Sequence, residues 1–145
     1  MASHAVPNAL VGAVLRSPAH RLLSGNLMLL TVRGRRTGRE YTFPVQYARD
    51  GDTVYVVPGG YRTKTWWRNL LEPAPVQVRI GADEYAGTGQ AFVGERDPER
   101  TADAFRAYLA HHPDSAKRRG LTTDDDARLR EAAAREAIVR IDLAR

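Results

Sequence analysis

The sequence predicts a β-rich α+β fold, in which a barrel of about six antiparallel strands carries peripheral helices. Three observations predict it. Segments of strand length with apolar or alternating character occur in pairs, glycine-containing turns join each pair, and helical periodicity is concentrated after residue 95. We expect one domain over residues 1–145, because 145 residues are enough to bury one hydrophobic core.

The expected strands follow one another as three hairpins and a late single strand. Leucine and valine form a continuous apolar run in the first, and the others alternate or are rich in β-branched residues. We place the barrel at about residues 26–94 and the last strand at about 137–143. The six expected ranges are Leu27–Val32, Arg39–Arg49, Thr53–Val57, Val76–Ile80, Glu84–Val93 and Ala137–Leu143.

Helices are expected before, within and after the barrel. An amphipathic helix at about 5–16 has Pro7 in its first turn, and one or two helical turns cover 64–71 before two prolines. Between about 98 and 135, we expect one helix over 98–111 and another over 122–135, the latter capped by threonine ahead of three aspartates.

The amino-acid composition limits the kinds of reaction that the protein can catalyse. The chain has no cysteine, which excludes disulfides, thiolate nucleophiles and cysteine-held metals, so any redox chemistry requires a bound organic cofactor. No stretch approaches a membrane span and no secretory leader is evident, so we expect a cytoplasmic protein without an integral membrane segment. The net charge is +5, and the basic residues are nearly all arginine, whose planar fork suits phosphate and carboxylate.

Four of these arginines stand within seven residues around a predicted tight turn, at Arg33, Arg35, Arg36 and Arg39. Two glycines in the same turn leave room for backbone N–H groups, so side chains and backbone can converge on one anion. The alternative is a solvated hairpin tip whose positive charge resists edge-to-edge aggregation.

A second candidate site follows the third strand. In Val57–Tyr61, the glycine pair would let backbone amides approach a planar ring, although a loop that needs positive φ has the same composition.

Trp66 and Trp67 lie about 100° apart on a helical turn, so we expect one in the core and the other in a pocket. His111 and His112 point apart and no serine has a nucleophile context, so we expect no metal site and no catalytic side chain.

Five separated elements agree in order and spacing with one known family. They are Leu29–Arg39, Pro44-Val45, Asp50–Asp52, Gly59-Gly60 and Trp66–Leu70. Together they resemble the deazaflavin-dependent nitroreductase family. The resemblance implies a split β-barrel of the flavin-reductase and pyridoxamine-phosphate-oxidase-like class that binds coenzyme F420. It further implies hydride transfer from the reduced deazaflavin to a quinone, nitroaromatic or other conjugated small-molecule acceptor.

The resemblance also implies which residues hold the coenzyme. The phosphate and oligoglutamate tail would meet the basic turn, the ring would lie along the end of the third strand, and the helical turn would close the pocket. The residues implied for these three roles are, in turn, Arg35, Arg36, Thr37, Gly38 and Arg39; Val57, Pro58, Gly59 and Gly60; and Lys64, Trp67 and Asn69. Where the family's reductases carry substrate tyrosines, this chain has only Tyr108.

Other functions remain open at this stage. An FMN-dependent reductase or oxidase could use the same barrel, because a fold does not determine its cofactor. A non-catalytic protein that binds a cofactor or a lipid is a further alternative. A nucleic-acid partner is disfavoured, since no stacking aromatic stands within 33–39. Split barrels often close their cofactor site between two subunits, so the resemblance is compatible with a homodimer.

Overall fold

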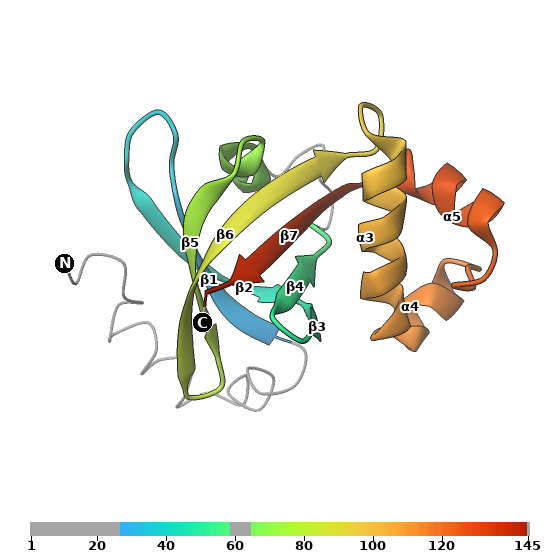
Figure 1. Cartoon of the computed structure of the whole chain (residues 1–145), viewed down its shortest axis with the longest axis horizontal. Helices are drawn as coiled ribbons and strands as arrows, with labels where there is room; N and C mark the ends of the chain where they lie inside the picture. Colours follow the sequence, from blue (N-terminus) through green and yellow to red (C-terminus); the bar gives the residue numbers. More distant parts are fainter. Residues whose placement is uncertain (1–26, 59–64, 145) are drawn as a thin grey trace.

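The computed structural model describes residues 27–58 and 65–144, which form a curled antiparallel sheet with helices beside it (Figure 1). The strand order in the sheet is β2-β1-β5-β6-β7-β4-β3. This is the expected split barrel, with seven strands instead of about six. Their bounds are β1 Leu27–Arg33, β2 Glu40–Gln46, β3 Ala48–Asp50, β4 Thr53–Val56, β5 Ala74–Ile80, β6 Asp83–Val93 and β7 Ala137–Leu143.

The additional strand arises because the segment expected as one strand over Arg39–Arg49 is divided at Tyr47. Before this residue the chain pairs with β1, and after it with β4. β2 and β3 therefore form the two edges of the sheet although one residue separates them in the chain, so the sheet must curl until its edges meet. No glycine or proline stands at position 47, and the alternation of apolar residues runs up to Tyr47, which is why the division escaped prediction.

All three expected hairpins are present. β1 and β2 pair over their full length around a tip at residues 34–39, with Leu27 opposite Gln46 and Arg33 opposite Glu40. β5 and β6 pair from Ala74 opposite Gly89 to the turn at residues 81–82. β1 pairs with β5 over three residues only, from Leu29 to Thr31, so the tip of the first hairpin separates from the sheet beyond that point.

The core has two parts, and β7 contributes to both. Val139 and Ile141 face the barrel interior with apolar residues of β1, β4 and β5, while Ile138 faces outward and packs against the helices. All three side chains are fully buried. A strand buried on both faces explains why the first half of β7 is a continuous apolar run.

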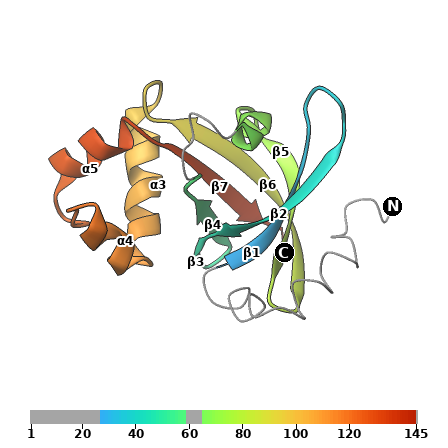
Figure 2. The same cartoon turned by 180° about the vertical axis from the view of Figure 1, so that it is seen from behind.

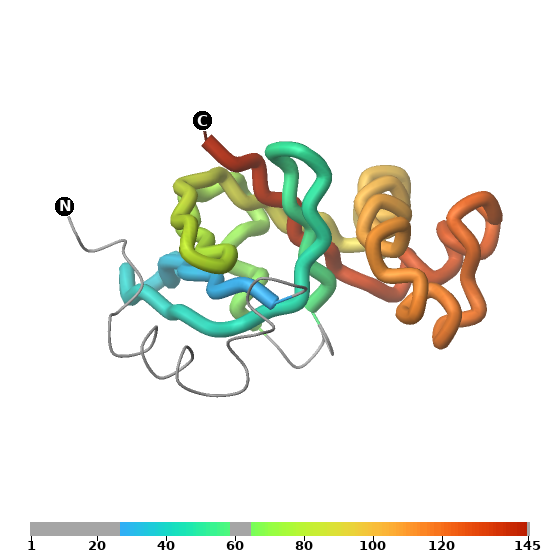
Figure 3. The backbone as a smooth tube through the Cα atoms, turned by 90° about the horizontal axis from the view of Figure 1, so that it is seen from below, coloured from blue at the N-terminus to red at the C-terminus, as the bar shows by residue number. Residues whose placement is uncertain are grey.

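The helices gather at one end of the sheet, opposite the β1–β2 hairpin (Figures 2 and 3). α3 spans Pro98–Ala110, α4 Pro113–Arg118 and α5 Asp126–Ala133. α4 was not expected. It begins on Pro113, which both ends α3 and fits a first helical position. α5 begins later than expected because Asp125, and not Thr122 or Thr123, accepts the capping hydrogen bond from the Arg128 N–H at 3.2 Å.

Tyr108 joins α3 to the strands. Its ring stacks on His112 with centroids 4.4 Å apart, and its hydroxyl lies 3.5 Å from the amide oxygen of Gln46. Burial raises the pKa of the Tyr108 phenol, against a smaller lowering by Arg119 and Arg118. The ring of His112 in turn contacts the Tyr47 carbonyl oxygen at 2.6 Å, so the helices hold the chain at the point where β2 passes into β3.

None of the helices described in 27–58 and 65–144 is long and apolar enough to cross a membrane. A short 3-10 helix, η2 at Trp66–Leu70, stands where one or two helical turns were expected. The helix expected at about 5–16 lies outside the described residues.

We predict that Gly94→Ala destabilises the protein more than Gly38→Ala. A Cβ at Gly94 would lie 1.8 Å from the Ala133 carbonyl oxygen, so α5 would have to move, at a cost of about 3 kcal/mol. A Cβ at Gly38 meets nothing within 4 Å, and the substitution costs only the strain of φ +71°, about 1 kcal/mol. Urea unfolding of both variants measures the difference. The reverse ranking would show that α5 does not seat on Gly94.

Candidate functional site

The tip of the β1–β2 hairpin is ordered by its own backbone. The Gly34 N–H donates to the Arg39 carbonyl at 2.7 Å, and the Gly38 N–H donates to the Gly34 carbonyl at 2.9 Å. The Thr37 hydroxyl accepts from the Arg39 N–H at 3.2 Å. Gly38 has φ +71°, a conformation that side-chain-bearing residues rarely adopt. These bonds hold the tip in one conformation and direct its side chains outward.

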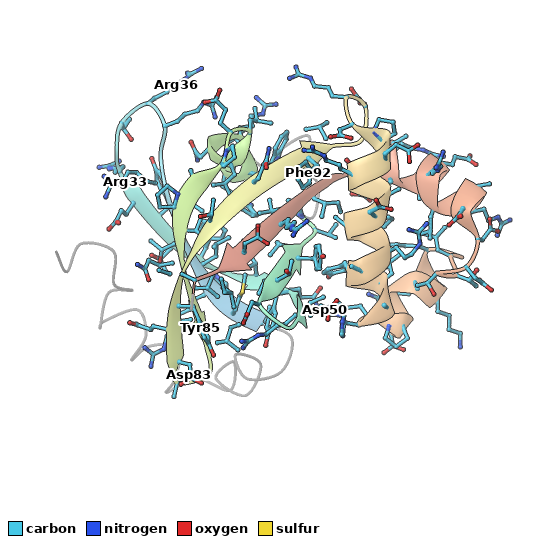
Figure 4. The ribbon with its side chains drawn as sticks, viewed as in Figure 1. Arg33, Arg36, Asp50, Asp83, Tyr85 and Phe92 are labelled. Atoms are coloured by element: carbon cyan, nitrogen blue, oxygen red, sulfur yellow. The ribbon has the colours of Figure 1, made fainter. Side chains whose placement is uncertain are left out.

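The arginines of this tip differ in their electrostatic environment. Arg33, on the strand, forms an ion pair with Glu40 at 3.8 Å. Arg35, Arg36 and Arg39 are exposed, and none of them forms an ion pair with a residue in the described ranges. Figure 4 shows Arg36 extending from the tip away from the barrel. The tip therefore presents unneutralised guanidinium groups to a ligand.

The two tryptophans of η2 point in different directions, as their spacing predicts. Trp67 is only 5% exposed and belongs to the barrel core. Trp66 is half-buried and its ring lies 4.9 Å from that of Phe43 on β2, at an interplanar angle of 57°. The Arg68 guanidinium lies over the Trp67 ring, 5.5 Å from its centroid.

Asn69 connects η2 to the hairpin. Its side-chain oxygen accepts a hydrogen bond from the Arg35 N–H at 3.0 Å, and its side-chain nitrogen donates to the Trp66 carbonyl at 3.0 Å. The Asn69 amide thus connects η2 to the hairpin tip through hydrogen bonds, although Asn69 and Arg35 lie 34 residues apart in the sequence.

A cavity of about 570 Å³ lies between the hairpin tip, β2 and η2. Its basic side comes from the tip and Arg68, and its aromatic side comes from β2 and η2. The described residues that line it are Gly34, Arg35, Arg36, Thr37, Tyr41, Phe43, Thr65, Trp66, Arg68 and Asn69.

Four of the residues implied for coenzyme binding meet in this cavity: Arg35, Arg36, Thr37 and Asn69. Gly38 lines a neighbouring groove of about 640 Å³, and Arg39 lies outside the cavity lining. Val57 is half-buried against the helix-side core, and Pro58 is buried. Gly59, Gly60 and Lys64 lie outside the described residues.

The expectation for Trp67 differs from the structure, because its neighbour Trp66 takes the position on the cavity. Trp67 fills the core, where its large apolar ring contributes most to stability, and reaches only a separate groove. Tyr41 and Phe43 were also missed as lining residues. Their spacing of two in a strand places them on one face, so alternation carried a signal that they act together.

The cavity combines cationic groups with aromatic side chains. Guanidinium groups bind phosphate or carboxylate through paired N–H donors, and aromatic rings contact a flat apolar group. Among the lining residues described there is no aspartate, glutamate or histidine, so this part of the wall offers no general base. The arrangement suits a ligand with an anionic part and a planar part.

Two solved structures share the fold. An F420-H2 dependent reductase (FDR-A) superposes with a TM-score of 0.55 at 15% identity, covering 81% of this chain and 95% of that one. A protein described as a domain-swapped dimer also gives 0.55, at 14% identity, covering 91% of this chain and 99% of that one. At this identity the likeness shows the fold alone, and the chain is a split β-barrel protein.

The chain belongs to the F420H(2)-dependent quinone reductase family, whose model matches residues 13–123. It is 31% identical over 75 residues to an F420H(2)-dependent quinone reductase of Mycobacterium tuberculosis and to a putative one of Mycobacterium bovis. The match covers 50% of this chain and 50% of each relative, so the chain spans about half the length of the curated relatives it matches. The deazaflavin-type family expected from the sequence is thereby confirmed.

We predict that Asn69→Ala lowers the free energy of unfolding by about 1–2 kcal/mol, because two hydrogen bonds are lost. It should also speed amide hydrogen exchange at Arg35. Asn69→Asp is the matched variant: its carboxylate still accepts from the Arg35 N–H but no longer donates to Trp66, so exchange at Arg35 should stay slow. If exchange at Arg35 is the same in both variants and the parent protein, Asn69 does not anchor the hairpin.

Proposed function

We propose that this protein is an F420H2-dependent oxidoreductase that transfers a hydride from the reduced deazaflavin to a quinone or another conjugated acceptor. The observation that carries the proposal is the cavity in which the unpaired arginines of the hairpin face an aromatic wall. Membership of the quinone reductase family supports it.

The basic side of the cavity fits the anionic part of the coenzyme. Arg35 and Arg36 line the cavity and form no ion pair with any residue in the described ranges. We assign them, with Arg39 and the Thr37 hydroxyl, to the phosphate and the glutamate tail. The Gly34 and Gly38 N–H groups are already bonded within the tip, so we assign the donors mainly to the side chains. Because the tip is held by its own bonds, little ordering accompanies binding.

The aromatic side fits the flat part of the coenzyme. We infer that Trp66 and Phe43 pack beside it and exclude water, since their rings already lie in contact at the cavity wall. Val57 and Pro58 directly follow β4, and we propose that they lie along the deazaflavin ring. Pro58 has no N–H, so any backbone donor to the ring must come from a neighbouring residue.

When bound, the reduced coenzyme supplies the hydride, and the protein contributes position and a water-excluding surface. The described lining of the cavity contains no aspartate, glutamate or histidine. We therefore propose no catalytic side chain, and a small-molecule electron acceptor as the second substrate. We also propose a homodimer, which light scattering of the purified protein can test.

Fluorescence titration with F420, and in parallel with FMN, tests the cofactor. Binding of F420 at micromolar concentration or below, about 8 kcal/mol, supports the proposal, and oxidation of F420H2 by menadione in the presence of the protein would establish turnover. Binding of FMN alone would move the protein to flavin chemistry. Binding of neither would overturn the proposed function.

We predict that Arg35→Ala combined with Arg36→Ala raises the Kd for F420 by at least about tenfold at low salt, because two charge-assisted contacts are lost. The difference should shrink near 1 M salt, where charges are screened within about 3 Å. Lys117→Ala combined with Arg118→Ala is the matched control, since it removes the same charge from the exposed end of α4. Equal losses in both double variants would indicate a general effect of net charge.

A further inference from the structure

The outer part of the β1–β2 hairpin is paired on one side only. β1 pairs with β2 as far as Arg33, but with β5 only as far as Thr31, which lies opposite Gln77. If the same register continued, Arg33 would lie opposite Pro75. Proline has no N–H and occurs in strands where one side lacks a partner, so Pro75 favours the separation of β1 from β5.

A groove of about 640 Å³ lies at this separation. Residues of both strands line it, among them Val32 on β1 and Ala74 on β5. In Figures 1 and 2, the hairpin tip projects apart from β5. Gly34, Arg35 and Asn69 line both this groove and the cavity of the candidate site. Two hollows therefore border the hairpin tip, which leaves it room to move.

The hairpin tip is a unit with a defined base. The N–H groups of its two glycines are bonded within the tip, and the ion pair of Arg33 with Glu40 joins the two strands beneath it. Val32, the preceding residue, is 1% exposed and belongs to the barrel core. The segment that can move without disturbing the core is therefore 33–40, and its internal bonds should keep it in one piece.

One hydrogen bond crosses from this segment to η2. The Arg35 N–H donates to the side-chain oxygen of Asn69 at 3.0 Å, at an exposed position. Water can replace an exposed hydrogen bond at little cost, so this contact can open while the core stays intact. Opening would separate the cavity wall that carries Arg35 and Arg36 from the wall that carries Trp66.

We propose that residues 33–40 form a hinged flap, which Pro75 frees from β5 and Asn69 latches to η2. The flap swings about Val32 and Tyr41, which lie opposite each other at its base, and its opening admits the ligand to the cavity. The identity of that ligand as F420 rests on the proposed function, and the motion itself does not. The coenzyme enters and leaves through the open form, so the flap sets the rates of both steps.

Amide hydrogen exchange of the ligand-free protein tests the motion. In a flap that moves as one body, the Arg35 N–H loses its partner each time the latch opens, whereas the Gly34 and Gly38 N–H groups keep theirs. The protection factor of Arg35 should therefore be at least about tenfold below those of the two glycines. Equal protection at all three positions would overturn the flap, since the tip would then be fixed or would unfold as a whole.

Pro75→Val tests the hinge. The substitution returns an N–H and a β-branched side chain to β5, so the ladder with β1 can extend towards Arg33. Protection at Arg35 should rise about threefold or more. In stopped-flow mixing with F420, association and dissociation should both slow by a similar factor, while the Kd stays within about twofold because the two rates change together.

Pro44→Val is the matched control. It makes the same change on β2, which already pairs with β1 over its full length, so exchange at Arg35 and both rates should stay as in the parent protein. Unchanged exchange at Arg35 in Pro75→Val would overturn the hinge, and slower exchange with unchanged F420 rates would overturn the role in ligand entry. Exchange requires no ligand, so failure of F420 to bind would overturn the proposed function while the exchange data still decide the flap.

Discussion

The whole arrangement depends on the passage of the chain from one edge of the sheet to the other at Tyr47. β2 and β3 are consecutive, yet they pair with β1 and β4 at opposite ends of the strand order. Such a connection is possible only in a sheet that curls on itself. Curling encloses the apolar side chains of five strands in one interior, and His112 contacts the Tyr47 carbonyl oxygen where the chain crosses between the edges.

The tip of the β1–β2 hairpin projects beyond the closed sheet. Because β1 pairs with β5 over only three residues, the tip at 34–39 leaves the sheet and would be free to move if nothing else held it. Its internal hydrogen bonds and the amide of Asn69 supply that support. The basic residues thus lie on a hydrogen-bonded hairpin tip beside η2, and the hollow between the two is the candidate coenzyme site.

Two hollows beside η2 differ in the side chains that line them. The cavity towards β2 offers aromatic contact, and the groove towards the turn after β6 offers mainly charge. Arg35 and Arg68 line both hollows. Most arginines on the helices form ion pairs with neighbouring acidic residues. The unpaired positive charge of the described residues is therefore not spread evenly over the surface.

Local sequence alone determined much of this protein. Turn residues and short alternating runs predicted the hairpins, and the four clustered arginines indicated a candidate anion site, because these features depend on neighbours within a few residues. The same reasoning missed the division at Tyr47 and the helix at Pro113–Arg118. Only the tertiary structure decided that Trp66 and not Trp67 borders the cavity, that Asn69 reaches the hairpin, and that Arg96 lies near Arg35. Those relations join residues from 23 to 61 positions apart, and no local pattern records which distant segments a curled sheet will bring together.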